Sequence, residues 1–196
     1  MGIGGTTSSK GTRFQMKLFA IAAAAAALIA TPALAALPVG APAPKFSAPA
    51  FLAGQQFEFE LAKALKKGPV VLYFFPAAHT TGCNIEAHMF ADAIDKFKAQ
   101  GATVIGVTAG NIDQLAAFST ETEHCSGKFP VASDPDDVIA KQYDATFAYK
   151  GQTVTNRTSY VIGRNDKVLF TYTDLKPEQH ISLTLDAVTK YQAEHH

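Results

Sequence analysis

The strongest constraint on the fold is a pair of buried-strand patterns separated by one helical pattern. Val70 to Phe75 reads VVLYFF, and Thr103 to Thr108 reads TVIGVT. Continuous apolar runs of this length are typical of strands that are buried on both faces. Between them, apolar residues recur at three- and four-residue spacing from Ile85 to Phe97, which indicates an amphipathic helix. A strand, a helix and a strand in this order predict a parallel pair inside an α/β domain.

The other segments predict a mixed central sheet flanked by helices. Leu37–Pro49 reads as an extended leader, and FLAGQQFEFEL at 51–61 predicts a small hairpin with a Gly-Gln-Gln turn. Further strands are expected at 129–132, 159–163 and 167–172, the last two as a hairpin. Helices are expected from Asn111 to Glu123, from Ser133 to Tyr143, and from Pro177 onward. We find no internal repeat, second domain or linker.

The first 35 residues carry the pattern of a secretory signal peptide. Three basic residues precede the apolar run Leu18–Ala30, whose 13 residues fall short of the about 20 that cross a bilayer as a helix. Ala33-Leu34-Ala35 follows as a small-x-small cleavage site. We therefore expect residues 1–35 to be removed, with Met16 as an alternative start. Residues 36–196 would form one exported, periplasmic domain without a membrane anchor; a buried alanine-rich helix is the alternative interpretation of the apolar run.

Charge and cysteine content exclude several classes of protein. Lys plus Arg and Asp plus Glu both number 17, and loss of residues 1–35 removes three basic and no acidic residues, which leaves a net charge of −3. A chain of this charge is unsuited to binding nucleic acid. Two cysteines, Cys83 and Cys125, are too few for a disulfide framework or a four-cysteine zinc site.

One turn concentrates the candidate chemistry, and it reads Pro76-Ala77-Ala78-His79-Thr80-Thr81-Gly82-Cys83. It follows a buried strand, and ligands of open α/β sheets bind at the carboxyl ends of strands. Cys83 stands at the expected start of the helix, where free N–H groups and the helix dipole stabilise an anion such as a thiolate. Gly82 lets the backbone approach a bound group. A reactive cysteine and a buried structural cysteine both fit this position.

The spacing Pro76-x-x-x-Thr80-x-x-Cys83 resembles the active-site signature P-x-x-x-T-x-x-C of the peroxiredoxins. FPVASDP at 129–135 is similar to the F-P-L-L-S-D-P segment of the bacterioferritin-comigratory, or peroxiredoxin Q, branch, and RTSYVI at 157–162 is similar to its R-x-T/S-aromatic-x-I strand. The matches run in order through residues 40–192. The resemblance implies a thioredoxin-like α/β fold with an N-terminal hairpin, and a thiol peroxidase that needs no metal, haem or flavin.

The resemblance also implies a role for each site residue. Cys83 resembles the peroxidatic cysteine, whose thiolate attacks a hydroperoxide and becomes a sulfenic acid. Thr80 resembles the hydroxyl that positions the peroxide, and Arg157 the arginine that stabilises the thiolate and the leaving oxygen. Supporting positions of the same loop and helix are Pro76, Gly82 and Glu86. For the glutamate, an ordinary acid of the first helical turn is the alternative.

Cys125 is the candidate resolving cysteine. Many members of the branch have this cysteine five residues after the peroxidatic one, where the present chain has His88. Cys125 lies 42 residues after Cys83, at the end of a predicted helix from which some relatives resolve. The resemblance implies an intramolecular disulfide that a thiol reductant, such as a thioredoxin-like protein, resets in a monomer or weak dimer. A static disulfide and an unrelated free thiol are the alternatives.

Three interpretations stay open from the sequence. His79 is expected to be a solvated loop histidine, and a contribution to the thiolate or metal binding together with His88 is the alternative. Instead of a peroxidase, the chain can be an exported thiol–disulfide oxidoreductase that acts through Cys83. It can also be a non-catalytic thioredoxin-fold binding module with a fixed bond between Cys83 and Cys125.

Overall fold

A computed structural model describes residues 1–2, 4–5 and 36–195. The chain divides into two units, Met1–Pro32 and Ala33–His196, and all described helices and strands belong to the second unit. The predicted signal peptide, its cleavage site and the alternative start at Met16 fall on residues outside the described ranges, so they stay predictions. Among the residues that are described, each helix falls short of the length and apolar character that a membrane crossing requires.

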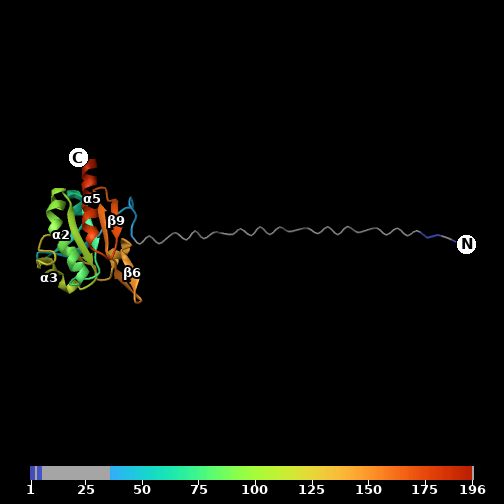
Figure 1. Cartoon of the computed structure of the whole chain (residues 1–196), viewed down its shortest axis with the longest axis horizontal. Helices are drawn as coiled ribbons and strands as arrows, with labels where there is room; N and C mark the ends of the chain where they lie inside the picture. Colours follow the sequence, from blue (N-terminus) through green and yellow to red (C-terminus); the bar gives the residue numbers. More distant parts are fainter. Residues whose placement is uncertain (3, 6–35, 196) are drawn as a thin grey trace. The chain divides into compact units, whose positions relative to one another are not determined.

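A seven-stranded mixed sheet forms the centre of the second unit (Figure 1). Strands β3 (Val70–Phe74), β4 (Thr103–Thr108) and β5 (Val131–Ser133) run parallel, which confirms the predicted parallel pair. Strand β8 (Thr158–Ile162) pairs antiparallel with β3, and β9 (Val168–Thr173) pairs antiparallel with β8. The strand order is β2-β1-β5-β4-β3-β8-β9. The loop that leaves β3 therefore lies between the ends of β4 and β8.

The predicted N-terminal hairpin is present, but its turn comes earlier than expected. Strands β1 (Ser47–Leu52) and β2 (Gln55–Glu60) are joined by Ala53 and Gly54, both with positive φ, at 49° and 78°. A two-residue turn with positive φ at both positions matches the twist of a hairpin. The first strand thus begins inside the segment that the sequence analysis expected to be an extended leader.

Helices cover both faces of the sheet, and each face has its own hydrophobic cluster. One cluster includes Val71, Tyr73 and Val104, and the other includes Val70, Leu72 and Ile105, as expected for strands whose successive side chains point to opposite faces. The helices on the first face are α2 (Thr81–Ala99), α3 (Leu115–Thr120) and α5 (Glu178–His195). Those on the second face are α1 (Leu61–Lys67) and α4 (Val138–Gln142).

Several elements differ from the sequence-based expectation, among them the helix expected from Ser133 to Tyr143, which is the shorter α4. Helix α1 and the separate hairpin of β6 (Thr146–Tyr149) and β7 (Gln152–Thr155) were not predicted. The helix expected from Asn111 to Glu123 is shorter: a 3₁₀ turn, η1 (Ile112–Gln114), leads into α3, which ends at Thr120. Asn111 precedes η1, but its side chain makes no capping hydrogen bond; its amide donates to the carbonyl of Ala78 at 2.7 Å instead.

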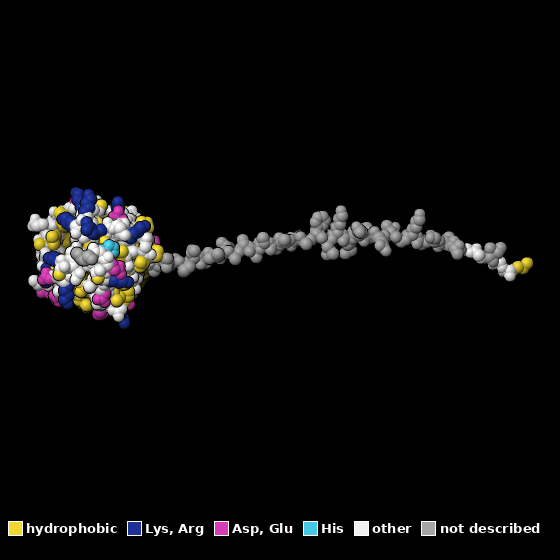
Figure 2. All heavy atoms as spheres, turned by 90° about the horizontal axis from the view of Figure 1, so that it is seen from above, with side chains coloured by type: hydrophobic (Ala, Val, Ile, Leu, Met, Phe, Trp, Pro, Cys, Tyr) yellow, Lys and Arg dark blue, Asp and Glu magenta, His cyan; other side chains and the backbone are white. Residues whose placement is uncertain are grey.

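Acidic and basic side chains are mixed on the surface of the folded unit. On the face that Figure 2 displays, Lys and Arg side chains lie among Asp and Glu side chains, with hydrophobic side chains in small groups between them. This distribution agrees with the balanced composition of the chain.

Candidate active site

Cys83 lies in the first turn of α2, where the sequence placed it, and its residue is only 1% exposed. Thr80 is the N-cap residue of this helix and has an extended backbone, at φ −106° and ψ 146°. The loop before it is tied to β4, because the hydroxyl of Thr108 donates to the carbonyl of Pro76 at 3.1 Å. The structure therefore holds Pro76, Thr80 and Cys83 in one strand-to-helix turn.

Arg157 directly precedes β8, and its side chain reaches the sulfur of Cys83. Its Nη2 donates to Sγ of Cys83 at 3.5 Å, its Nε donates to the carbonyl of Leu175 at 2.9 Å, and its Nη1 donates to Oε2 of Glu86. These three bonds hold the planar guanidinium in one orientation. A Cβ added to Gly82 would lie 3.0 Å from Nη2, so a larger residue there would press on the guanidinium.

Glu86 is completely buried behind this arginine. Burial raises the pKa of its carboxyl group to about 8, and the neighbouring guanidinium of Arg157 acts in the opposite direction. Because Glu86 contacts the arginine, the structure favours the orienting role over that of an ordinary acid of the first helical turn.

His180 extends this arrangement, and the sequence analysis missed it. Its Nδ1 lies 3.7 Å from Oε1 of Glu86. Its Nε2 donates to the carbonyl of Asp174 at 2.9 Å, which leaves Nδ1 to accept from the hydroxyl of Ser159 at 2.8 Å. Burial lowers the pKa of His180 to about 4, so the imidazole is neutral at physiological pH. The sequence offered no signal for it beyond a histidine in the first turn of the last helix.

The hydroxyl of Thr80 has a different partner from the one expected. It donates to the carbonyl of Ala77 at 3.0 Å, and Thr80 is exposed. Because its hydrogen is used in this bond, the oxygen keeps its lone pairs for a donor that approaches from solvent. The structure thus places Thr80 in the same turn as the cysteine, with its hydroxyl donating to the loop carbonyl.

Cys125 lies in the turns after α3 and is completely buried. Burial raises the pKa of its thiol well above the ordinary value, so it is a neutral thiol in this conformation. Both cysteines are free. The fixed bond between Cys83 and Cys125 that a binding module would use is therefore absent from this state of the protein.

Comparison with known proteins assigns the family. Residues 39–171, more than half of the chain, match the AhpC/TSA family. The protein is a peroxiredoxin of this family. It is 34% identical to the chloroplastic peroxiredoxin Q of Sedum lineare over 61% of this chain and 63% of that protein. It is 33% identical to the chloroplastic peroxiredoxin Q of Oryza sativa subsp. japonica over 79% of this chain and 75% of that protein.

A solved structure supports the same assignment. The crystal structure of peroxidoxin BcpB from Mycobacterium tuberculosis is 26% identical, covers 79% of this chain and 97% of that chain, and gives a TM-score of 0.69. The predicted thioredoxin-like fold and the predicted peroxiredoxin Q resemblance are thereby confirmed. The chain spans less than two thirds of the length of the Sedum lineare protein.

His79 of this peroxiredoxin lies in the loop before α2 and is partly exposed, as the sequence analysis expected, but two side chains also hold its ring. Its Nδ1 lies 2.7 Å from Oε1 of Gln114, and its Nε2 lies 2.8 Å from Oε2 of Glu121. The hydrogen bond with Glu121 raises the pKa of His79 above its ordinary value. His88, the alternative metal partner from the sequence, instead lies 3.6 Å from Asp92 on the same helix.

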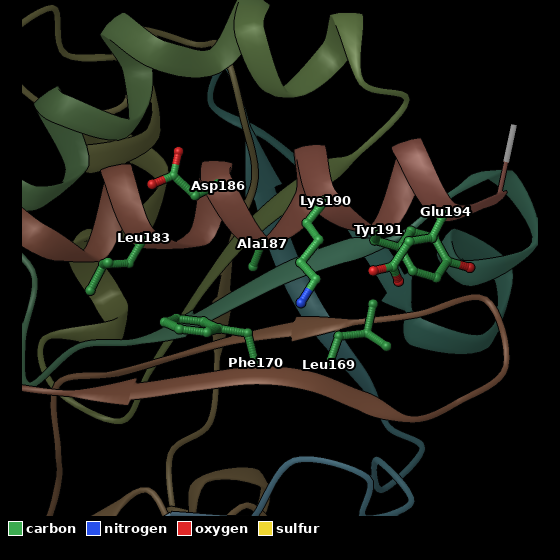
Figure 3. Close-up of a pocket in the computed structure, with 8 residues that line it drawn as sticks. All are labelled: Leu169, Phe170, Leu183, Asp186, Ala187, Lys190, Tyr191 and Glu194. Atoms are coloured by element: carbon green, nitrogen blue, oxygen red, sulfur yellow. The ribbon is translucent and has the colours of Figure 1, made fainter.

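The groove of Figure 3 is separate from these residues. It has a volume of about 360 Å³ and lies between α5 and β9, with Phe170 and Leu183 at one end and Tyr191 at the other. None of the predicted site residues lines it. The predicted site residues therefore lie at the turn before α2 and away from this groove.

Proposed function

We propose that this peroxiredoxin reduces hydrogen peroxide or alkyl hydroperoxides, with Cys83 as the peroxidatic cysteine. The observation that carries the proposal is the 3.5 Å contact between Nη2 of Arg157 and the buried sulfur of Cys83 at the start of α2. The thiolate attacks the terminal oxygen of the hydroperoxide, an S–O bond forms and the O–O bond breaks. Cys83 becomes a sulfenic acid, and the leaving oxygen takes a proton to give water or an alcohol.

The surrounding groups act on the charge that moves during this step. Arg157 stabilises the thiolate and then the negative charge on the leaving oxygen. Thr80 accepts a hydrogen bond from the peroxide, because its own hydrogen is donated to Ala77. Glu86 positions the guanidinium from behind. Pro76 shapes the loop, and Gly82 leaves room for the guanidinium beside the sulfur.

Cys125 is the proposed resolving cysteine. Its thiol condenses with the sulfenic acid on Cys83, so that an S–S bond forms and water leaves. Because Cys125 is buried, we expect the turns that carry it to open when the bond forms. These turns include Ser126 and Gly127 with positive φ, at 54° and 66°, and they lie between α3 and β5. A thiol reductant such as a thioredoxin-like protein then supplies two electrons and restores both thiols, in a monomer or weak dimer.

Intact mass tests both steps. The pre-reduced protein is mixed with one equivalent of hydrogen peroxide, and the mass and the linked peptides are measured. The proposal expects a loss of two hydrogens with Cys83 and Cys125 in one peptide pair. In the matched variant Cys125→Ser, Cys83 should gain oxygen at an unchanged rate. Oxygen gain on Cys83 of the wild type, with Cys125 untouched, would contradict resolution by Cys125, and an unmodified Cys83 would contradict peroxidase function altogether.

The export of the protein to a bacterial periplasm is a further part of the proposal. Its support is the basic segment, the apolar run Leu18–Ala30 and the small-x-small site that ends at Ala35. Expression of the full chain in a bacterium, followed by fractionation and N-terminal sequencing, should recover a periplasmic protein that begins at Ala36. An uncut chain in the cytoplasm would contradict it.

A further inference from the structure

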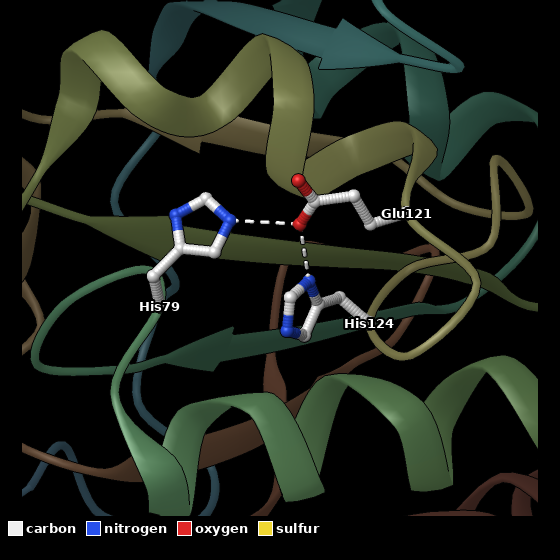
Figure 4. Close-up of side chains that lie close together, drawn as sticks. All are labelled: His79, Glu121 and His124. Carbon is white, nitrogen blue, oxygen red and sulfur yellow. Dashed lines mark hydrogen bonds and ion pairs between the residues drawn. The ribbon is translucent and has the colours of Figure 1, made fainter.

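Three potential metal ligands converge beside the active-site turn (Figure 4). His79 comes from the loop before α2, Glu121 follows α3 directly, and His124 lies in the next turn. Oε2 of Glu121 lies 2.8 Å from Nε2 of His79 and 2.7 Å from Nδ1 of His124. One ligand atom from each residue lies within 4.8 Å of the other two.

We propose that His79, Glu121 and His124 bind a divalent transition-metal ion, with zinc as the best fit. Two imidazole nitrogens and one carboxylate oxygen form a ligand set that zinc uses, with the fourth position open to water. Imidazole ligands also suit copper and nickel, whereas magnesium and calcium prefer oxygen ligands alone. The proposed ion takes no part in the peroxide chemistry that is proposed at Cys83.

The neighbour of His79 prepares this ring for metal binding. Oε1 of Gln114 lies 2.7 Å from Nδ1 of His79, so the amide oxygen accepts the Nδ1–H. Nε2 is then the ring nitrogen that points toward the carboxylate of Glu121, 2.8 Å from its Oε2. A metal-binding histidine commonly donates its other ring N–H to a second group, and this bond orients the ring.

Phe118 holds both imidazole rings in place. The ring of His124 stacks on it with centroids 4.7 Å apart, and the ring of His79 meets it edge-on at 5.3 Å. The cluster nevertheless remains open to solvent, because the side chains of His79 and Glu121 are 27% and 40% exposed. An ion can therefore reach a site whose ligands are already oriented.

The proposed site joins the two segments that carry the cysteines. His79 lies next to Thr80 in the peroxidatic turn, and His124 lies next to Cys125. If Cys125 resolves Cys83, a bound ion would restrain the opening that the disulfide requires. This consequence rests on the proposed function, whereas metal binding itself does not.

Metal binding is tested on the full mature chain with both cysteines replaced, Cys83→Ser and Cys125→Ser, so that no thiolate can bind the ion. Zinc affinity is measured by competition with a chromophoric chelator, and cobalt spectra report the coordination geometry. We expect one ion per chain. Loss of a group that only orients a ligand weakens metal binding by about 10- to 100-fold, which is the loss expected for Gln114→Ala. Glu121→Gln, which removes a ligand, should lose more.

Controls separate this cluster from other histidines. His88→Gln, and replacement of His195 and His196 together, should leave the affinity unchanged. Far-UV circular dichroism without metal shows whether each variant is folded, and Gln114→Ala keeps the test valid if Glu121→Gln does not fold. Equal zinc affinity in the parent, Glu121→Gln and Gln114→Ala would overturn the proposal, as would its loss in the control variants. Absence of metal binding in the parent would also overturn the proposal, and hydrogen bonds alone would then hold the three side chains together.

A second measurement follows the wild-type chain after one equivalent of peroxide, with zinc or with a chelator. Zinc should slow disulfide formation in the wild type and have a much smaller effect in Glu121→Gln. Equal slowing in both proteins would overturn the restraint and assign the effect to zinc on the cysteines. If no disulfide forms even with chelator, the resolving role of Cys125 fails, while the binding result in the cysteine-free chain stands.

Discussion

Replacement of Arg157 by lysine separates the charge of this residue from its geometry. Lysine keeps the positive charge, but its compact ammonium lacks the planar fork that contacts Glu86, the Leu175 carbonyl and the Cys83 sulfur together. Hydrogen bonds to charged groups contribute about 1.5–3 kcal/mol, and about 1.4 kcal/mol corresponds to a factor of ten in rate. Loss of the Nη2–Sγ bond therefore predicts about 10- to 150-fold slower oxidation of Cys83.

The assay measures the second-order rate constant of Cys83 oxidation by hydrogen peroxide in a Cys125→Ser background, by stopped-flow mixing and mass spectrometry. Arg164→Lys is the matched control, because Arg164 is the other arginine of residues 36–196 and is exposed in the turn between β8 and β9. The control should match the parent. The reasoning would be refuted if a folded Arg157→Lys protein had a rate constant within about threefold of the parent's, which is less than the loss of one charged hydrogen bond predicts. The positive charge alone would then be sufficient.

Three further outcomes follow from the structure. Thr80→Val keeps the β-branched shape and removes the hydroxyl that would accept from the peroxide. Loss of one neutral hydrogen bond of about 0.5–1.5 kcal/mol should slow Cys83 oxidation in the same assay by about 2- to 13-fold; an unchanged rate would show that the hydroxyl has no part in the reaction. Gly106→Ala brings a Cβ to within 2.7 Å of the Tyr73 ring. Overpacking of this kind costs about 1–3 kcal/mol, so the midpoint of urea unfolding should fall. A midpoint equal to that of the wild type would mean that the ring moves aside without cost. Burial lowers the pKa of His180 from 6.5 to about 4, so the unfolded chain binds this proton first as the pH falls. The contribution of the neutral imidazole to the free energy of unfolding is complete above pH 6.5 and is lost as the pH falls toward 4. Urea titrations should therefore show that the free energy of unfolding falls more steeply over this range in the wild type than in His180→Asn. Parallel pH profiles of the two proteins would contradict a neutral, buried imidazole.

Local sequence patterns predicted a strand correctly where the whole segment is buried in the core. The runs that became β3 and β4 are buried at nearly every position, so their continuous apolar pattern predicted them. Helix α1 was missed because it is short and its last two residues, Lys66 and Lys67, run into Gly68-Pro69, so that the four together are typical of a turn. The hairpin of β6 and β7 was missed because its strands are largely exposed and outside the main sheet, so they carry no alternation of apolar and polar residues.

The amino-acid sequence alone determined the strand-to-helix turn, the cysteine at its end and the spacing to Pro76 and Thr80, since all of these depend on neighbours in the chain. Only the tertiary structure placed Arg157 on the sulfur with Glu86 behind it, because these two residues are 71 positions apart and meet through the pairing of β3 with β8.

The same reason applies to the two histidine sites. His180 reaches Glu86 because α5 packs beside α2, and His79 meets Glu121 across 42 positions because the turn before α2 lies against the end of α3. No periodicity or local spacing encodes such contacts. They arise from the order of the strands and from which face of the sheet each helix covers.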